Sequence, residues 1–125
     1  MTPQEVAEKH GFRVVHQSWK TERLPAGIIS SCFRSWSTHS PQALHVLWTD
    51  SDNLQLVHDH YPEFLEMYNN FPMGIMRADM VRVLYLHRFG GLYVDMDYEA
   101  KSDFFSQLPP AEKKGKKYAS LYAVE

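Results

Sequence analysis

The sequence has little cysteine, no long apolar run and no strong excess of charge of either sign. Cys32 is the only cysteine, which excludes an intrachain disulfide and leaves the compartment open. No apolar stretch approaches the ~20 residues of a membrane-spanning helix, and the first residues, MTPQEVAEKHG, have no signal-peptide core. Thirteen basic and fifteen acidic residues give a net charge of -2. The sequence therefore predicts no transmembrane segment in this chain and no nucleic-acid partner.

What the sequence does contain is typical of one folded α/β domain, which we expect to span residues 1–125. Its 125 residues are 44% hydrophobic and 14% aromatic, enough to bury a core. Helices are predicted at residues 2–10, 28–37, from 50 onward, 62–71 and 75–89, and strands at 12–16, 43–49, 92–95 and within 118–124. Strands separated by helices favour a sheet with mostly parallel pairing.

The longest periodic segment, residues 75–89, is predicted to be a helix that leads directly into the strand at 92–95. Five of its side chains share one face: Met76, Met80, Val83, Leu84 and His87. The helix is expected to end at Gly90-Gly91, with Gly90 well placed as a left-handed cap.

The stretch RFGGLYVDMD (88–97) places two carboxylates, Asp95 and Asp97, beside an apolar run. On an extended chain alternate residues face the same way, so the two would project together, about 7 Å apart at their backbones. Facing carboxylates repel unless they share a proton or bind a cation, and oxygen ligands suit Mg²⁺ or Mn²⁺. Ligands of open α/β sheets also sit beyond the carboxyl ends of strands. The spacing alone is equally compatible with a strand that runs into an acidic turn.

The string IMRADMVRVLYLHRFGGLYVDMDYEA (75–100), with VVHQSWK (14–20) and LWTDSDN (47–53) upstream, resembles a known enzyme family. It is similar to the glycosyltransferases with a D-x-D sugar-binding region, which include fungal α-1,6-mannosyltransferases and mannosyl inositol-phosphoceramide synthases. The resemblance covers roughly residues 12–103. It implies a GT-A (Rossmann-like) fold, a nucleotide-sugar donor, a divalent ion and transfer with retention of anomeric configuration.

The resemblance also assigns roles to residues near the D-x-D. Asp95 and Asp97 match the motif itself, where one carboxylate contacts the ribose and metal side and the other binds the ion that bridges the diphosphate. Asp79 and Arg82 match helix positions that hold the donor's sugar and ribose. The alternative for this pair is a surface ion pair worth only ~0.5 kcal/mol. Arg77 points in another direction from the helix and is a weaker candidate.

Further donor contacts are implied at the first strand and beside the motif. Val15, His16 and Gln17 match the end of the first strand, where the nucleotide base is expected. Trp19 could stack on that base, although a place in the core or at its rim suits it equally. Tyr93 is on the same side as the two aspartates by strand alternation, and simple packing would also explain it.

The resemblance predicts Mn²⁺ or Mg²⁺ as cofactor and a donor that is GDP-mannose, or alternatively a UDP-hexose, with a glycan or glycolipid as acceptor. By family analogy the enzyme would work in the Golgi or another endomembrane lumen, although the chain shows no targeting signal.

Two alternatives to this function remain. Family members continue well beyond the D-x-D, so the chain could be a truncated, inactive or donor-binding-only fragment, incomplete at its C-terminus. A haloacid-dehalogenase-like phosphatase also uses D-x-D, but Tyr98-Glu99 and the late position of the motif disfavour it.

Overall fold

Three short parallel strands organise the structure, a computed structural model that describes residues 2–10 and 13–107. The helices are α1 (Pro3–His10), α2 (Ile28–His39), α3 (Asp50–His60), α4 (Leu65–Asn70) and α5 (Gly74–Phe89), with 3₁₀ turns η1 (Pro62–Phe64) and η2 (Phe105–Gln107). The strands are β1 (Val14–Ser18), β2 (Leu44–Trp48) and β3 (Leu92–Tyr93). The predicted α/β class with parallel pairing is therefore confirmed.

The sheet has the order β2-β1-β3, so the first strand of the chain lies in the middle. Val14 pairs with Leu44, and His16 pairs with Tyr93, both in parallel register. The ladder towards β3 ends with one further bond, from the Val94 amide to the His16 carbonyl oxygen at 3.0 Å. Because all three strands are parallel, the segments that follow them leave at the same edge of the sheet.

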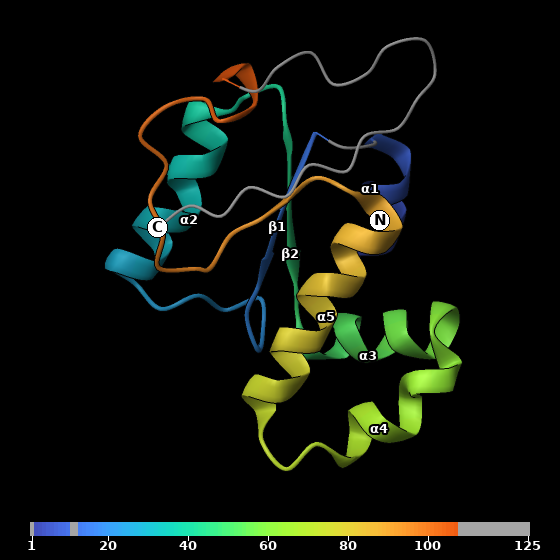
Figure 1. The fold of residues 1–125 in the computed structure, drawn as a ribbon. Coiled ribbons are helices and arrows are strands. Elements are labelled where there is room, and N and C mark those ends of the chain that lie inside the picture. Colours follow the sequence, from blue (N-terminus) through green and yellow to red (C-terminus); the bar gives the residue numbers. More distant parts are fainter. Residues whose placement is uncertain (1, 11–12, 108–125) are drawn as a thin grey trace, which may run out of the picture.

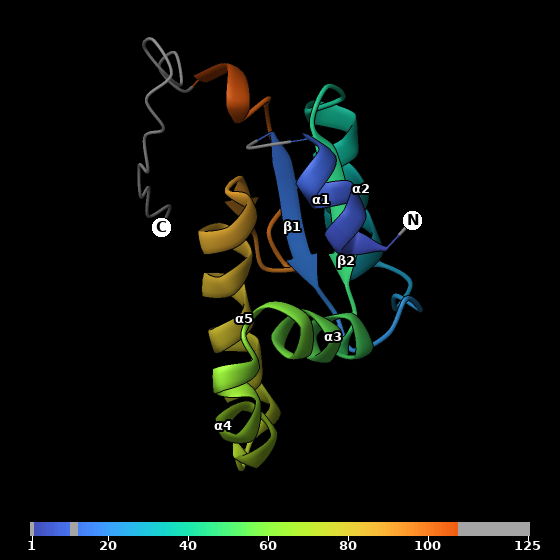
Figure 2. The ribbon, with the colours of Figure 1, turned by 90° about the vertical axis from the view of Figure 1, so that its right-hand side faces the viewer.

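Helices cover both faces of the sheet (Figures 1 and 2): α2 packs on one face, and α1, α3 and α5 pack on the other. Alternation along β1 serves the two cores, since Val14 joins the larger cluster and Val15 the smaller one beneath α2. The larger cluster consists of Ala7, Val14, Val46, Trp48, Leu56, Val57, Tyr61, Tyr68, Val81, Leu84, Tyr85 and Phe89. Among the described residues no helix is long and apolar enough to cross a membrane.

The buried face of α5 differs from the five-residue face that the periodicity indicates. Val81, Leu84, Tyr85 and Phe89 are buried, whereas Val83 is 61% exposed. Tyr85 decides the orientation, because its ring stacks on the Trp48 ring at 4.4 Å between centroids. The aromatic side chains bury more apolar area than Val83 or the methionines would, so they turn the helix towards the sheet.

Two glycines carry the chain from α5 into β3. Gly90 ends the helix with a positive φ of 71°, but its ψ of −160° is not that of the left-handed cap that was expected. Its amide donates to the Leu86 carbonyl oxygen at 3.0 Å. Gly91 follows at φ 95°, and an added Cβ there would lie 2.4 Å from the Val14 carbonyl oxygen. The second glycine is thus required by the close approach of β1 as well as by its backbone angle.

Element boundaries differ from the predicted ones by a few residues. The first strand continues to Ser18 instead of ending at His16, because its polar residues find partners: Asn53 donates to the Ser18 hydroxyl at 3.3 Å. The predicted helix 62–71 is divided into η1 and α4. The predicted strand 92–95 ends at Tyr93, and the predicted strand within 118–124 lies outside the described residues.

Candidate functional site

The two aspartates lie in a turn at the carboxyl edge of the sheet. The Tyr98 amide donates to the Asp95 carbonyl oxygen at 3.2 Å, and Met96 and Asp97 form the turn between them. This corrects the expectation that an extended strand presents the motif; the alternative of an acidic turn describes the backbone better. Burial nevertheless alternates, since Val94 and Met96 are buried while Asp95 and Asp97 are both exposed. Both carboxylates are accessible to a ligand.

Helix α2 fastens the chain on the far side of this turn. The Trp36 indole donates to the Tyr98 carbonyl oxygen at 3.0 Å, and the Ala100 amide donates to the Ser35 hydroxyl at 2.8 Å. These two contacts join positions about sixty residues apart in the chain. No spacing of residues in the sequence predicts these two contacts. The only sequence feature that relates to them is that Trp36 belongs to the apolar face of its helix.

A pocket of about 220 Å³ opens over the edge strand β3 beside the turn. Asp95, Tyr93 and Arg82 line it together, so the structure brings three of the predicted site residues to one place. The remaining lining residues are mainly apolar or aromatic: Trp36, Leu92, Val94, Tyr98 and Phe104. Aromatic walls with a few charged groups are typical of small-molecule sites.

The charges around this pocket act on Tyr93. Burial is the main cause that raises the pKa of Tyr93 to about 12, and the Asp95 charge and a hydrogen bond with Asp95 raise it further. Arg82 opposes the shift and Asp79 adds to it, so both helix side chains are close enough to act on the same hydroxyl. The hydroxyl of Tyr93 is therefore protonated at neutral pH and lies in the field of the Asp95 charge.

Asp79 and Arg82 form an ion pair on the exposed side of α5, with Arg82 Nη2 3.0 Å from Asp79 Oδ1. Their side chains are 56% and 43% exposed, so the pair adds little to stability. Arg77, the weaker candidate, donates instead to the Phe71 carbonyl oxygen at 3.1 Å and satisfies the end of α4.

The three predicted base-binding residues on β1 are buried, with side chains at most 1% exposed. His16 uses both ring nitrogens inside the fold: Nε2 lies 2.9 Å from the Gly90 carbonyl oxygen, and Nδ1 accepts from the Trp48 indole at 3.1 Å. Burial lowers the pKa of His16 to about 4, so the ring is neutral. Base binding by Val15, His16 and Gln17 stays a prediction, and these side chains do not face solvent. Trp19, at the carboxyl end of β1, is half-buried.

The residues present fit a hard divalent ion held mainly by its substrate. Among residues 2–10 and 13–107, no group of three or more Asp, Glu, His or Cys side chains could hold a metal. At this site the protein would supply the ion with the carboxylate oxygens of Asp95 and Asp97, without a third ligand of these types from the described residues. Mg²⁺ and Mn²⁺ are commonly bound in this way, by one or two carboxylates with phosphate oxygens and water as the other ligands. Metal binding by the pair stays a prediction.

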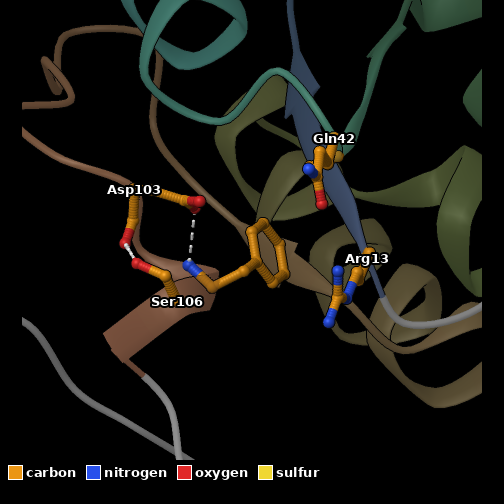
Figure 3. Close-up of a pocket in the computed structure, with 6 residues that line it drawn as sticks. Arg13, Gln42, Asp103 and Ser106 are labelled. Atoms are coloured by element: carbon orange, nitrogen blue, oxygen red, sulfur yellow. Dashed lines mark hydrogen bonds between the residues drawn. The ribbon is translucent and has the colours of Figure 1, made fainter.

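A second pocket, of about 230 Å³, lies at the amino ends of the strands, opposite the carboxyl ends where the D-x-D turn lies (Figure 3). Arg13 and Gln42 line it from positions just before β1 and β2. On the other side Asp103 accepts from the Phe105 amide at 3.1 Å, and the Ser106 hydroxyl donates to the Asp103 carbonyl oxygen at 2.9 Å. None of the predicted site residues lines this pocket.

A parallel α/β sheet with an acidic turn at its carboxyl edge defines a chain of the Rossmann-like class. Comparison with known proteins identifies the family. A family model described as "Glycosyltransferase sugar-binding region containing DXD motif" matches residues 29–114, well over half of the chain. The chain belongs to this glycosyltransferase family, as the resemblance predicts. The match contains α5, both aspartates and all of α2 except its first residue, whereas the segment 14–20 lies outside it.

Curated proteins that are similar to this chain, and whose names describe the transfer of mannose to a ceramide lipid, come from two yeasts. Inositol phosphoceramide mannosyltransferase 3 of Schizosaccharomyces pombe is 39% identical over an alignment of 88 residues, and the match covers 68% of this chain and 24% of that protein. Mannosyl phosphorylinositol ceramide synthase SUR1 of Saccharomyces cerevisiae is 33% identical over 85 residues, 68% of this chain and 22% of that protein. The chain thus spans about a quarter of the length of these relatives. No solved structure matches the chain significantly.

Proposed function

We propose that this chain carries the donor-binding site of a metal-dependent retaining glycosyltransferase that moves mannose from a nucleotide-sugar to a glycolipid or glycan. The observation that carries the proposal is the shared pocket of Asp95, Tyr93 and Arg82 beside the exposed D-x-D turn. The names of the yeast relatives favour mannose, and hence GDP-mannose, over a UDP-hexose. They also favour a sphingolipid such as inositol phosphoceramide as acceptor, and the analogy extends to a Golgi or other endomembrane lumen.

Each group of the site has a separate task in this proposal. Asp95 and Asp97 hold Mn²⁺ or Mg²⁺, whose positive charge would stabilise the departing nucleoside diphosphate. Tyr93 lines the pocket beside Asp95 and offers a protonated hydroxyl to the donor. Asp79 and Arg82 offer an acceptor and a cation to the donor's hydroxyl groups from α5. The protein thereby orients the sugar and diphosphate before transfer.

Metal-dependent binding of a nucleoside diphosphate tests the proposal directly. Mn²⁺ together with GDP should raise the melting temperature of the chain, because a ligand that binds only the folded state stabilises it. Asp97→Asn should abolish that increase while leaving the melting temperature without ligand nearly unchanged, since Asp97 is exposed. Asp59→Asn, on the exposed end of α3, is a matched control that should keep the full response. An identical response in wild type and Asp97→Asn would refute the site.

A further inference from the structure

Hydrogen bonds between side chains connect α2, across the sheet, to the backbone of the D-x-D turn. Gln17 Nε2 lies 3.3 Å from the Asp95 carbonyl oxygen. The amide oxygen of Gln17 contacts Nε2 of His45 on β2. Nδ1 of His45 lies 3.0 Å from the Ser37 hydroxyl of α2. Four residues from four parts of the chain are thus joined in one series.

The direction of every bond in this series follows from its end at Asp95. A carbonyl oxygen only accepts, so Gln17 must turn its NH₂ group towards Asp95 and its oxygen towards His45. His45 then donates from Nε2, and the neutral ring accepts the Ser37 hydroxyl proton at Nδ1. Burial lowers the pKa of His45 to about 4, which agrees with a neutral ring. Gln17 therefore has one satisfactory orientation.

Gln17 takes over where the backbone ladder between β1 and β3 stops. The last backbone bond joins the Val94 amide to the His16 carbonyl oxygen, and the next contact along the same pair of segments is the Gln17 side chain on Asp95. The Gln17 side chain is fully buried. A buried amide that lost either partner would pay its desolvation cost without compensation, so the amide and the turn hold each other in place.

We infer that Gln17 is a positioning residue that fixes the backbone of Asp95, and with it the direction in which the Asp95 carboxylate leaves the turn. The inference rests on the proposed metal and diphosphate site and adds to it a residue that acts through the backbone of Asp95. Hydrogen-bonding partners behind a metal ligand commonly control its affinity, because they fix the ligand's orientation. The same residue explains how an exposed turn outside the sheet keeps a defined geometry.

Gln17→Leu tests this role, because leucine is of similar size and cannot hydrogen-bond. Two readouts are needed: hydrogen exchange of the Tyr98 amide, which donates to the Asp95 carbonyl oxygen, and the affinity for Mn²⁺ in the presence of GDP. We expect faster exchange at Tyr98 and about tenfold weaker Mn²⁺ binding. Ser40→Ala is the matched control, since it removes a buried hydrogen bond to Asp103, eight residues beyond Asp95, and should change neither readout.

The two readouts separate this inference from the proposed function. If wild type binds no Mn²⁺ with GDP or UDP, the proposed function fails, and exchange at Tyr98 still decides whether Gln17 holds the turn. If wild type binds Mn²⁺ and Gln17→Leu binds it equally well, the positioning role is wrong. His45→Phe is a second variant in case Gln17→Leu does not fold, because it keeps a ring beside Phe33. It removes the ring nitrogens that bond Gln17 and Ser37, and with them the partner that orients Gln17. It should give an intermediate loss of Mn²⁺ affinity, and an unchanged affinity would overturn the inference.

Discussion

Replacing Gly91 by alanine should destabilise the whole fold, because the residue sits where α5 enters β3 against the backbone of β1. A Cβ at this position would lie 2.4 Å from the Val14 carbonyl oxygen and 3.3 Å from His16 Nε2. Contacts below 3.0 Å are essentially never made by real Cβ atoms, so β1 and β3 would have to separate by several tenths of an ångström. The obstacle is backbone, which cannot rotate away as a side chain would.

The structure separates this cost into two parts. The positive φ of 95° costs an alanine roughly 1–2 kcal/mol, and forcing an extra carbon into a packed place costs another ~1–3 kcal/mol. We therefore expect Gly91→Ala to lower the free energy of unfolding by about 2–5 kcal/mol. Gly27 provides the control: its φ is 91°, but nothing lies within 4 Å of an added Cβ. Gly27→Ala should cost only the first part, roughly 1–2 kcal/mol.

Urea unfolding followed by tryptophan fluorescence measures both variants, since Trp48 is fully buried in the core. The informative quantity is the difference between the two free energies of unfolding, because both variants place alanine at a positive φ and only Gly91→Ala adds the clash with β1. A Gly91→Ala variant that is as stable as Gly27→Ala, or more stable, would refute the reasoning. It would mean that the close approach of Gly91 to Val14 does not limit the fold.

Two further predictions follow from charges. The fold should lose stability as the pH falls from about 6.5 towards 4, because burial lowers the pKa values of His16 and His45 to about 4 and only the unfolded chain takes up their protons in that range. Equal urea midpoints at pH 7 and pH 5 would contradict it. Arg82→Ala should weaken GDP-mannose binding but spare GDP, since only the former presents a hexose to α5, and it should change stability by no more than ~0.5 kcal/mol. An equal loss for both ligands would exclude a sugar contact.

The alternation of elements was predictable from the sequence because each signal is local. The apolar runs at β1 and β2 and the long period of α5 each lie within one short window. The glycine pair after Phe89 also indicates the backbone conformation at that point, since the chain must turn sharply between a helix and a strand. The D-x-D spacing and its surroundings were enough to predict the family, which the match over residues 29–114 confirms.

Long-range choices could not be predicted in the same way. The sequence shows apolar residues on more than one side of α5, and only packing against Trp48 selects Tyr85 for the core. The resemblance implied that His16 and Gln17 contact the nucleotide base, whereas the structure buries both side chains. Their partners, Gly90 and Asp95, are more than seventy residues away, and a single sequence carries no signal for such pairs.

The D-x-D motif keeps a defined orientation although the strand that was expected to present it ends at Tyr93. A strand would present Asp95 and Asp97 on one side through its pleat. Here the chain leaves the sheet after Tyr93, yet the buried Val94 and Met96 still alternate with the exposed Asp95 and Asp97. Side-chain donors on β1 and α2 replace the missing ladder by binding the carbonyl oxygens at the two ends of the turn. Because those donors are buried or half-buried side chains, the cost of leaving them unpaired holds the turn in place. The acidic pair can therefore stand free of the sheet, as the proposed binding of a diphosphate and its ion requires, without becoming a loose loop.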